Sequence, residues 1–282
     1  MDSAERFFRH LRRQPAVLVT VASVRGSVPR EVGAWMGVFA TDMIGTVGGG
    51  RLEFEALQEA RQQLSGFAGA GKLVPSLDGE PGQLRRFALG PTLGQCCGGE
   101  VHLRFECVTA ADVARLQERL TQLRHPVALF GGGHVGRALV RVLTDLPLAL
   151  HWIDSRDEVF PPDQPAHVRC EHSDPVQGAV PTLQSGSRVL IMSFSHAEDL
   201  DVVAACLTRQ RQQGDLPFIG LIGSQTKWAT FRHRLQDRGY SAQELAQVTC
   251  PIGLPGIVGK QPEVIAVAVA AQILQTLAAE PP

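Results

Sequence analysis

The sequence lacks the features that mark several large classes of protein. Its 27 basic and 28 acidic residues nearly cancel, so the formal net charge of the 282 residues is −1. Without a basic excess or a basic stripe, the chain has no general electrostatic grip on nucleic acid. The N-terminal segment MDSAERFFRHLRRQ has no uninterrupted apolar run, so it is not a signal peptide. We expect a cytoplasmic protein that binds no nucleic acid.

A long hydrophobic run is also missing. The most apolar segment, residues 263–279, is short for crossing a bilayer and follows Pro262, a good residue for opening a helix. This segment has no polar alternation, so we interpret it as a buried core helix. We therefore expect no membrane partner.

Cysteines in pairs of useful spacing are absent too. Six cysteines occur, but none form the C-x-x-C motif of zinc ribbons and thioredoxin-type sites. A cytoplasmic chain keeps its thiols reduced. Cys206 lies in the apolar helical pattern LDVVAACL, which indicates a small buried hydrophobic residue.

What is present indicates an α/β protein of two domains, which the length allows. In the first half, strands are expected at 16–24, near 35–40 and at 101–108, with helices at 3–14 and after the glycines at 48–50. An amphipathic helix at 109–126 follows, and along it we place the boundary between domains 1–115 and 116–282.

The second half alternates strands and helices. Apolar strands are expected at 126–133, 148–154, 188–194 and 217–224. The helix after the first of them carries apolar residues at helical spacing: Val135, Ala138, Leu139, Val142, Leu143 and Leu146. Such alternation predicts a mainly parallel sheet that helices cover on both faces.

A glycine motif joins the first strand of this half to its helix. Gly131, Gly133 and Gly136 fit G-x-G-x-x-G, and Asp154 ends the next strand. Glycines let a phosphate approach the backbone, free N–H groups at the helix start bind it, and the carboxylate can bind a ribose hydroxyl. The alternative is a tight turn without a ligand. His134 either contacts a ligand there or is an ordinary loop residue.

Other polar residues follow strands or glycines. Ser195 and His196 come at the end of the strand at 188–194, where ligands bind in open α/β sheets, although His196 could merely neighbour a helix cap. Gly223, Ser224 and Lys227 are candidate pocket walls after the next strand. In the first half, Gly48, Gly49 and Gly50 could form an anion nest with Arg51 beside it, or only a flexible helix entry.

The segment LGQCCGGEV holds the sharpest chemical signal. Cys96 and Cys97 present soft sulfur, which suits transition metals or persulfide chemistry, and Gly98 and Gly99 permit close approach of a ligand. Two adjacent thiolates alone make a poor tetrahedral zinc site. The alternative is that one cysteine packs inward and only the other faces a ligand.

Together, seven segments resemble the XdhC/CoxI family over nearly the whole chain and in the family's order. They are RGSVPREVGAWMGV, GTVGGGRLEFEAL, LGPTLGQCCGGEV, FGGGHVGRALVRVL, FSHAEDLD, LIGSQTKWATFRHRL and CPIGLPGIVGKQPEVIAVAVAAQIL. The resemblance implies a smaller N-terminal α/β domain and a C-terminal Rossmann-like domain.

The resemblance also implies a function that residue spacing does not give. Members of this family bind the molybdenum cofactor (molybdopterin), protect it while a cysteine desulfurase supplies sulfur, and pass it to the molybdenum subunit of xanthine dehydrogenase. They are accessory proteins that self-associate, as dimers or larger assemblies, and are not enzymes themselves.

The family pattern also implies roles for particular residues. Cys96 and Cys97 become the thiols near molybdenum or the transferred sulfur, and the glycines at 131, 133 and 136 cradle a phosphate. Many relatives carry one cysteine before the Gly-Gly pair, so the doubled cysteine leaves open which thiol matters.

Three other functions remain open. The motif at 131–136 with Asp154 fits an NAD(P)-dependent oxidoreductase, although no paired acid and base for hydride transfer is evident. Cys96 or Cys97 could carry persulfide in a sulfurtransferase. The chain could also be an interaction scaffold only.

Overall fold

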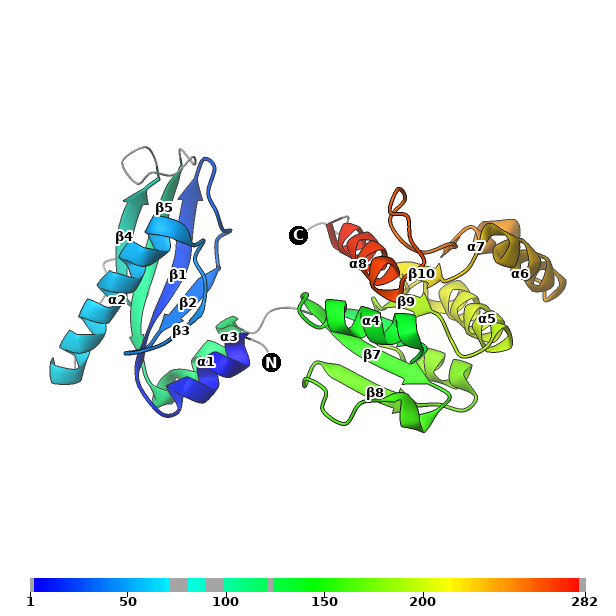
Figure 1. Cartoon of the computed structure of the whole chain (residues 1–282), viewed down its shortest axis with the longest axis horizontal. Helices are drawn as coiled ribbons and strands as arrows, with labels where there is room; N and C mark the ends of the chain where they lie inside the picture. Colours follow the sequence, from blue (N-terminus) through cyan, green and yellow to red (C-terminus); the bar gives the residue numbers. More distant parts are fainter. Residues whose placement is uncertain (1–2, 71–80, 90–98, 121–123, 279–282) are drawn as a thin grey trace. The chain divides into compact units, whose positions relative to one another are not determined.

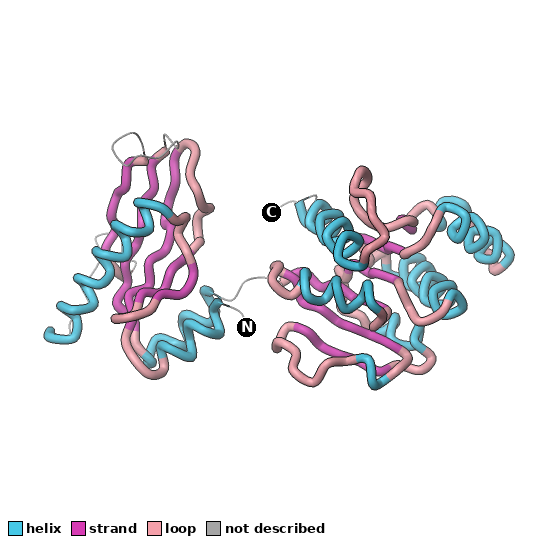
Figure 2. The backbone as a smooth tube through the Cα atoms, in the orientation of Figure 1, coloured by secondary structure: helices cyan, strands magenta, loops and turns pink. Residues whose placement is uncertain are grey.

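The structure is a computed structural model that describes residues 3–70, 81–89, 99–120 and 124–278. The chain divides into two units, Met1–Thr121 and Gln122–Pro282. The division follows helix α3 (Val113–Leu120), so the boundary expected after residue 115 falls inside that helix. Figures 1 and 2 show each unit as a sheet with helices against it.

The N-terminal unit is built on a five-stranded antiparallel sheet, in the order β3-β2-β1-β5-β4. Its strands are β1 (Ala16–Arg25), β2 (Trp35–Val38), β3 (Met43–Gly45), β4 (Gln83–Ala88) and β5 (Glu100–Val108). Val17, in the central strand, lies opposite Val38 on one side and Cys107 on the other. Sequence analysis did not identify β3 or β4.

Alternation along β1 creates the two cores of this unit. Val17, Val19 and Val21 pack with Leu52 and Ala56 of helix α2 (Gly50–Ala70). Leu18 points the other way and packs with Phe7, Phe8 and Leu11 of helix α1 (Ser3–Leu11) and with Leu116 of α3. A short 3-10 helix, η2 (Ala110–Asp112), leads into α3.

The C-terminal unit is built on a six-stranded sheet in which every strand pair is parallel, in the order β11-β10-β9-β6-β7-β8. The strands are β6 (His125–Phe130), β7 (Leu148–Asp154), β8 (Val168–His172), β9 (Arg188–Ile191), β10 (Phe218–Leu221) and β11 (Val248–Thr249). This Rossmann order confirms the predicted α/β class for the unit.

Helices cover both faces of this sheet. Helices α4 (His134–Leu143) and α8 (Pro262–Ala278) pack over Val127 and Leu129 of β6. Helices α5 (His196–Gln213), α6 (Gln225–Asp237) and α7 (Ala242–Leu245) pack over Ala128 and Phe130 on the other face. The remaining turns are η3 (Asp157–Val159) and η4 (Val176–Thr182).

Two expectations about apolar segments have different outcomes. Cys206 is fully buried, and burial raises the pKa of its thiol to about 12, as expected for a core residue. Helix α8 begins at Pro262 as expected, but Val267 is 53% exposed and Leu274 38% exposed. The helix is therefore buried on one side only, because α4 and the sheet cover one stripe of it. Within the described ranges no helix is long and apolar enough to span a bilayer.

Candidate functional site

The strand order of the C-terminal unit locates its crevice. Because β6 connects to β7 on one side and β9 begins the other half of the sheet, the order reverses between β6 and β9. Ligands of open α/β sheets bind outside the carboxyl ends of the strands at this reversal. The loop at Gly131–Gly133 follows β6, and Met192 and Ser193 follow β9.

The three predicted glycines of the motif have different structural roles. Gly131 has φ +123°, and a Cβ there would lie 2.0 Å from the carbonyl oxygen of Met192. A Cβ on Gly136 would lie 2.0 Å from the carbonyl oxygen of Gly131. A Cβ on Gly133 would meet nothing within 4 Å. The outer glycines thus allow close packing of strand and helix, while the middle one borders open space.

Helix α4 begins at His134, directly after Gly133. Gly133 is the N-cap residue, and no side chain among the described residues caps this helix. Backbone N–H groups at the start of a helix without such a cap can bind an anion. His134 is exposed beside them, where it can reach a ligand.

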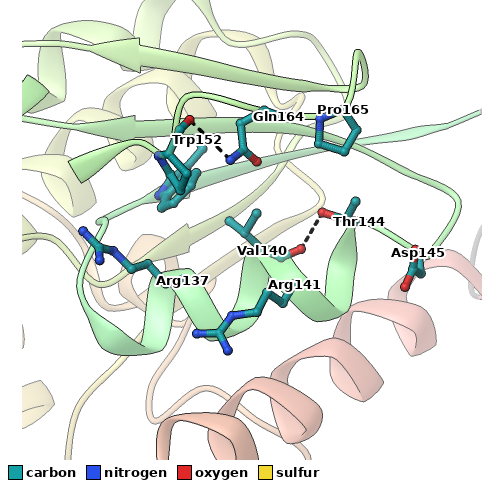
Figure 3. Close-up of a pocket in the computed structure, with 9 residues that line it drawn as sticks. Arg137, Val140, Arg141, Thr144, Asp145, Trp152, Gln164 and Pro165 are labelled. Carbon is teal, nitrogen blue, oxygen red and sulfur yellow. Dashed lines mark hydrogen bonds between the residues drawn. The ribbon is translucent and has the colours of Figure 1, made fainter. Parts of the chain in front are cut away.

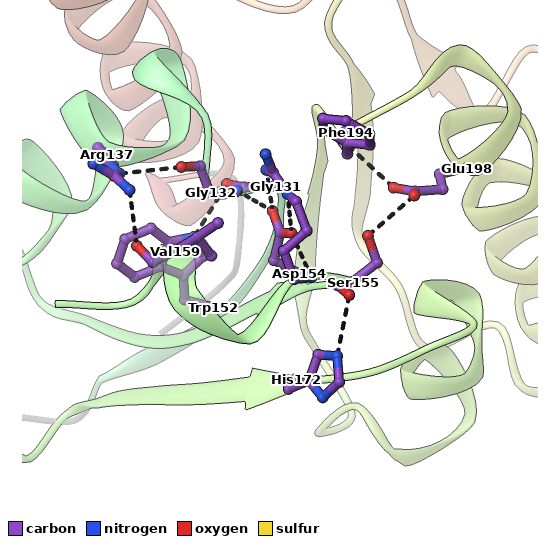
Figure 4. Close-up of polar contacts among 11 residues, drawn as sticks. Gly131, Gly132, Arg137, Trp152, Asp154, Ser155, Val159, His172, Phe194 and Glu198 are labelled. Atoms are coloured by element: carbon purple, nitrogen blue, oxygen red, sulfur yellow. Dashed lines mark hydrogen bonds and ion pairs between the residues drawn. The ribbon is translucent and has the colours of Figure 1, made fainter. Parts of the chain in front are cut away.

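Asp154 lies where a ribose-binding carboxylate was expected, but its oxygens are used within the protein (Figure 4). It is 2% exposed and accepts hydrogen bonds from the backbone N–H of Gly132 at 2.5 Å and of Arg156 at 2.9 Å. The Arg156 guanidinium adds two more, from Nε at 2.9 Å and Nη2 at 3.0 Å. Burial opposes its ionisation, but these bonds outweigh burial and lower the pKa of Asp154. A carboxylate has about four acceptor positions, so none is left for a ribose.

Ser195 and His196 belong to the start of α5. The Ser195 hydroxyl caps the helix by accepting from the backbone N–H of Glu198 at 3.2 Å. The exposed His196 ring lies edge-on to Phe231, with ring centroids 6.4 Å apart. Glu198 accepts from the Phe194 backbone N–H and the Ser155 hydroxyl, which ties the loops after β7 and β9 together (Figure 4).

A buried ion pair supports the loop after β9. Lys227 Nζ lies 2.6 Å from Asp199 Oδ2, with side chains 11% and 3% exposed. Asp199 Oδ1 accepts from the Ser193 backbone N–H at 2.7 Å. Cys250 lies nearby, and burial raises the pKa of its thiol to about 11. Lys227, expected in a pocket wall, therefore holds the framework of the site.

The glycine nest of the N-terminal unit is filled by a carboxylate of the same chain. Gly48, Gly49 and Gly50 all have positive φ, at 130°, 74° and 62°. Glu53 accepts from the backbone N–H groups of Val47 at 3.1 Å and Gly49 at 3.2 Å. The anion in the nest is thus Glu53, where an external ligand was expected. Arg51 instead pairs with Glu55 on the exposed side of the helix, at 2.9 Å.

Three motifs of the N-terminal unit converge at one end of its sheet. A Cβ on Gly99 would lie 2.3 Å from the carbonyl oxygen of Ser27 and 2.6 Å from that of Arg25. A Cβ on Gly48 would lie 2.5 Å from Cγ of Pro29. The loop after β1 therefore contacts both the glycine nest and the start of β5. Cys96, Cys97 and Gly98 lie outside the described residues, and they precede Gly99 in the chain.

A second concavity lies beside the glycine loop, on the outer side of α4 (Figure 3). It is a pocket of about 450 Å³ between α4 and the segment at 161–165. Trp152 in its lining donates from Nε1 to the Gly131 carbonyl oxygen at 3.0 Å, and Arg137 donates to that of Gly132 at 3.2 Å. Its lining therefore supports the glycine loop from behind. In the part of the chain that the structure describes, no group of three or more His, Cys, Asp or Glu side chains could hold a metal ion.

Family models match both units of this chain. The XdhC Rossmann domain matches residues 127–273, more than half of the chain, and the XdhC and CoxI family matches residues 10–70. The chain belongs to the XdhC and CoxI family. The predicted resemblance and the predicted C-terminal Rossmann-like domain are thereby confirmed.

Two known proteins are similar to this member of the family. A crystal structure described as a xanthine dehydrogenase from Bacillus halodurans matches with a TM-score of 0.76 at 18% identity, covering 100% of this chain and 97% of the other. Uncharacterized protein YqeB of Escherichia coli strain K12 is 24% identical over 266 residues. Those residues are 93% of this chain and 43% of YqeB, so the chain spans less than half of that relative.

Sequence reasoning missed residues whose importance depends on tertiary contacts. Arg156 fixes Asp154, Phe194 lies exposed beside it, and Asp199 pairs with Lys227. An arginine two residues after a strand-ending aspartate is a local signal that could have indicated the first contact. No local signal indicates the third, because Asp199 and Lys227 are 28 positions apart.

Proposed function

We propose that this protein is an accessory protein of xanthine dehydrogenase that binds the molybdenum cofactor, protects it during sulfuration and delivers it to the enzyme. The observation that carries this proposal is the match of both units to the XdhC family. The molybdenum subunit of xanthine dehydrogenase and a cysteine desulfurase are the proposed partners. Self-association and a cytoplasmic location are part of the same proposal, and the protein has no catalytic activity of its own in it.

The residues at one end of the N-terminal sheet fit such a cofactor. Gly99 packs directly on the carbonyl oxygens of Arg25 and Ser27, which leaves no room for a side chain. This close contact brings the chain that follows Cys96 and Cys97 to the arginine-bearing loop after β1. When bound, the cofactor supplies a molybdenum ion held by the dithiolene sulfurs of its pterin. Thiol sulfur is a suitable soft neighbour for such a centre, and arginine donors suit its phosphate.

An NAD(P)-dependent oxidoreductase has weaker support. The Rossmann strand order and the glycine loop favour a nucleotide. However, Asp154 already accepts four hydrogen bonds from Gly132 and Arg156, so it cannot bind ribose hydroxyls in the usual way. We therefore keep the cofactor chaperone as the proposed function.

Gel filtration with isolated molybdenum cofactor tests this proposal. We expect molybdenum and pterin to co-elute with the wild-type chain. Loss of co-elution in Cys96→Ala or Cys97→Ala would identify the thiol that contacts the cofactor. Co-elution with all three proteins would support the chaperone and assign binding to groups other than the thiols. If neither molybdenum nor pterin co-elutes with the wild-type chain, the proposal is wrong.

A further inference from the structure

An exposed aromatic ring stands at the carboxyl end of β9. Phe194 is 65% exposed although it directly neighbours the crevice of the C-terminal unit. Its backbone is held in place, since its N–H donates to Glu198 at 3.1 Å and the preceding N–H, of Ser193, donates to Asp199 at 2.7 Å. The ring is therefore displayed on a rigid support, and exposed aromatic side chains of this kind mark binding sites.

The guanidinium of Arg156 lies against this ring. Its Cζ is 4.3 Å from the centroid of Phe194. The two hydrogen bonds from Arg156 to Asp154 fix the plane of the guanidinium, so the ring and the guanidinium form one preorganised surface. Arg156 is 30% exposed, so part of its side chain remains accessible to a ligand. Planar guanidinium groups and aromatic rings are the two side-chain surfaces on which heterocyclic bases stack.

Contacts connect this surface to the glycine loop. Gly132 donates to Asp154, Asp154 holds Arg156, and Arg156 lies on Phe194 (Figure 4). A ligand on Phe194 is therefore beside the crevice at the strand reversal. Because Asp154 has no free acceptor position, recognition here depends on the faces of the ligand ring.

We propose that Phe194 and Arg156 form a stacking platform for a planar nitrogen heterocycle, either the pterin of the cofactor or a purine nucleotide. The pterin alternative rests on the proposed function, whereas the purine alternative does not. The platform gives the C-terminal unit a ligand-binding role that is separate from the thiols at 96 and 97.

Calorimetric titration of the full-length protein tests the platform with two probes that contain no metal and no dithiolene, namely pterin-6-carboxylate and GMP. We expect at least one of them to bind the wild-type chain, and Phe194→Ala to weaken that binding about tenfold, as loss of one stacked ring does. Phe194→Trp should retain it, because tryptophan keeps an aromatic face. Phe54→Ala is the matched control, since Phe54 is 59% exposed on helix α2 of the other unit.

Each outcome has a definite meaning. Pterin binding that depends on Phe194 supports the platform and assigns it to the cofactor, while GMP binding alone that depends on Phe194 assigns it to a nucleotide. Equal binding by wild type, Phe194→Ala and Phe54→Ala would overturn the platform, as would no binding of either probe. Since the probes lack molybdenum, a failed platform leaves the co-elution test of the chaperone unaffected, and a failed co-elution test leaves GMP binding to be judged alone.

Discussion

Replacing Lys227 by methionine is expected to lower the free energy of unfolding of the C-terminal unit by about 3–5 kcal/mol. The substitution leaves the carboxylate of Asp199, which is 3% exposed, without its cation. Chemical denaturation, followed by hydrogen exchange in peptides of β9 and β10, would measure the loss in this unit. The same loop carries Phe194 and Ser195, so we expect its exchange to increase first.

Two further variants separate the ion pair from simple loss of a lysine. Asp199→Asn combined with Lys227→Met should recover much of the stability, because asparagine is neutral and still accepts from the Ser193 N–H. Arg238→Met, which removes an exposed pair with Asp201 at 46% and 40% exposure, should cost less than about 1 kcal/mol. A Lys227→Met variant no less stable than Arg238→Met would refute this account of the loop.

Adding one methyl group at Gly136 is expected to destabilise the C-terminal unit by about 3 kcal/mol, near the upper end of typical overpacking costs. The new Cβ would lie 2.0 Å from the carbonyl oxygen of Gly131, so α4 would have to move away from the sheet. Gly131→Ala should be at least as harmful, because Gly131 also has φ +123°. Thermal and chemical unfolding of the purified variants would give these values.

Gly133→Ala is the matched control in the same loop. Its Cβ would meet nothing within 4 Å and its φ is −70°, so we expect stability within about 1 kcal/mol of wild type. Equal stability of Gly136→Ala and Gly133→Ala would contradict the assigned roles of the glycines. The comparison therefore distinguishes glycines required for packing from the one that borders the crevice.

Much of this fold is predictable because its strands are buried and its helices are amphipathic. The strand at 148–154 and the helical stripe from Val135 to Leu143 follow directly from their apolar patterns. β4, with the sequence QLRRFA, escaped prediction because it is an edge strand that is mostly accessible to solvent. β11 escaped because it has only two residues, and its identity as a strand depends on pairing with β10.

The candidate sites were less predictable than the fold, for physical reasons. The pattern of glycines located the loops correctly, but a pattern does not reveal which anion fills them. Glu53 fills one nest and Asp154 binds one N–H of the other loop. Both carboxylates belong to the chain itself, and their pairing depends on the backbone conformation of each loop.

Delivery of the cofactor to xanthine dehydrogenase tests the central claim most directly. Isolated molybdenum cofactor would be kept in air either free or with this protein, and then added with a cysteine desulfurase and cysteine to xanthine dehydrogenase that lacks the cofactor. We predict that the protein-bound sample restores more enzyme activity per molybdenum than the free sample, and that the difference grows with time in air. Equal activity from the two samples at every time would contradict the proposed role as a protecting and delivering chaperone.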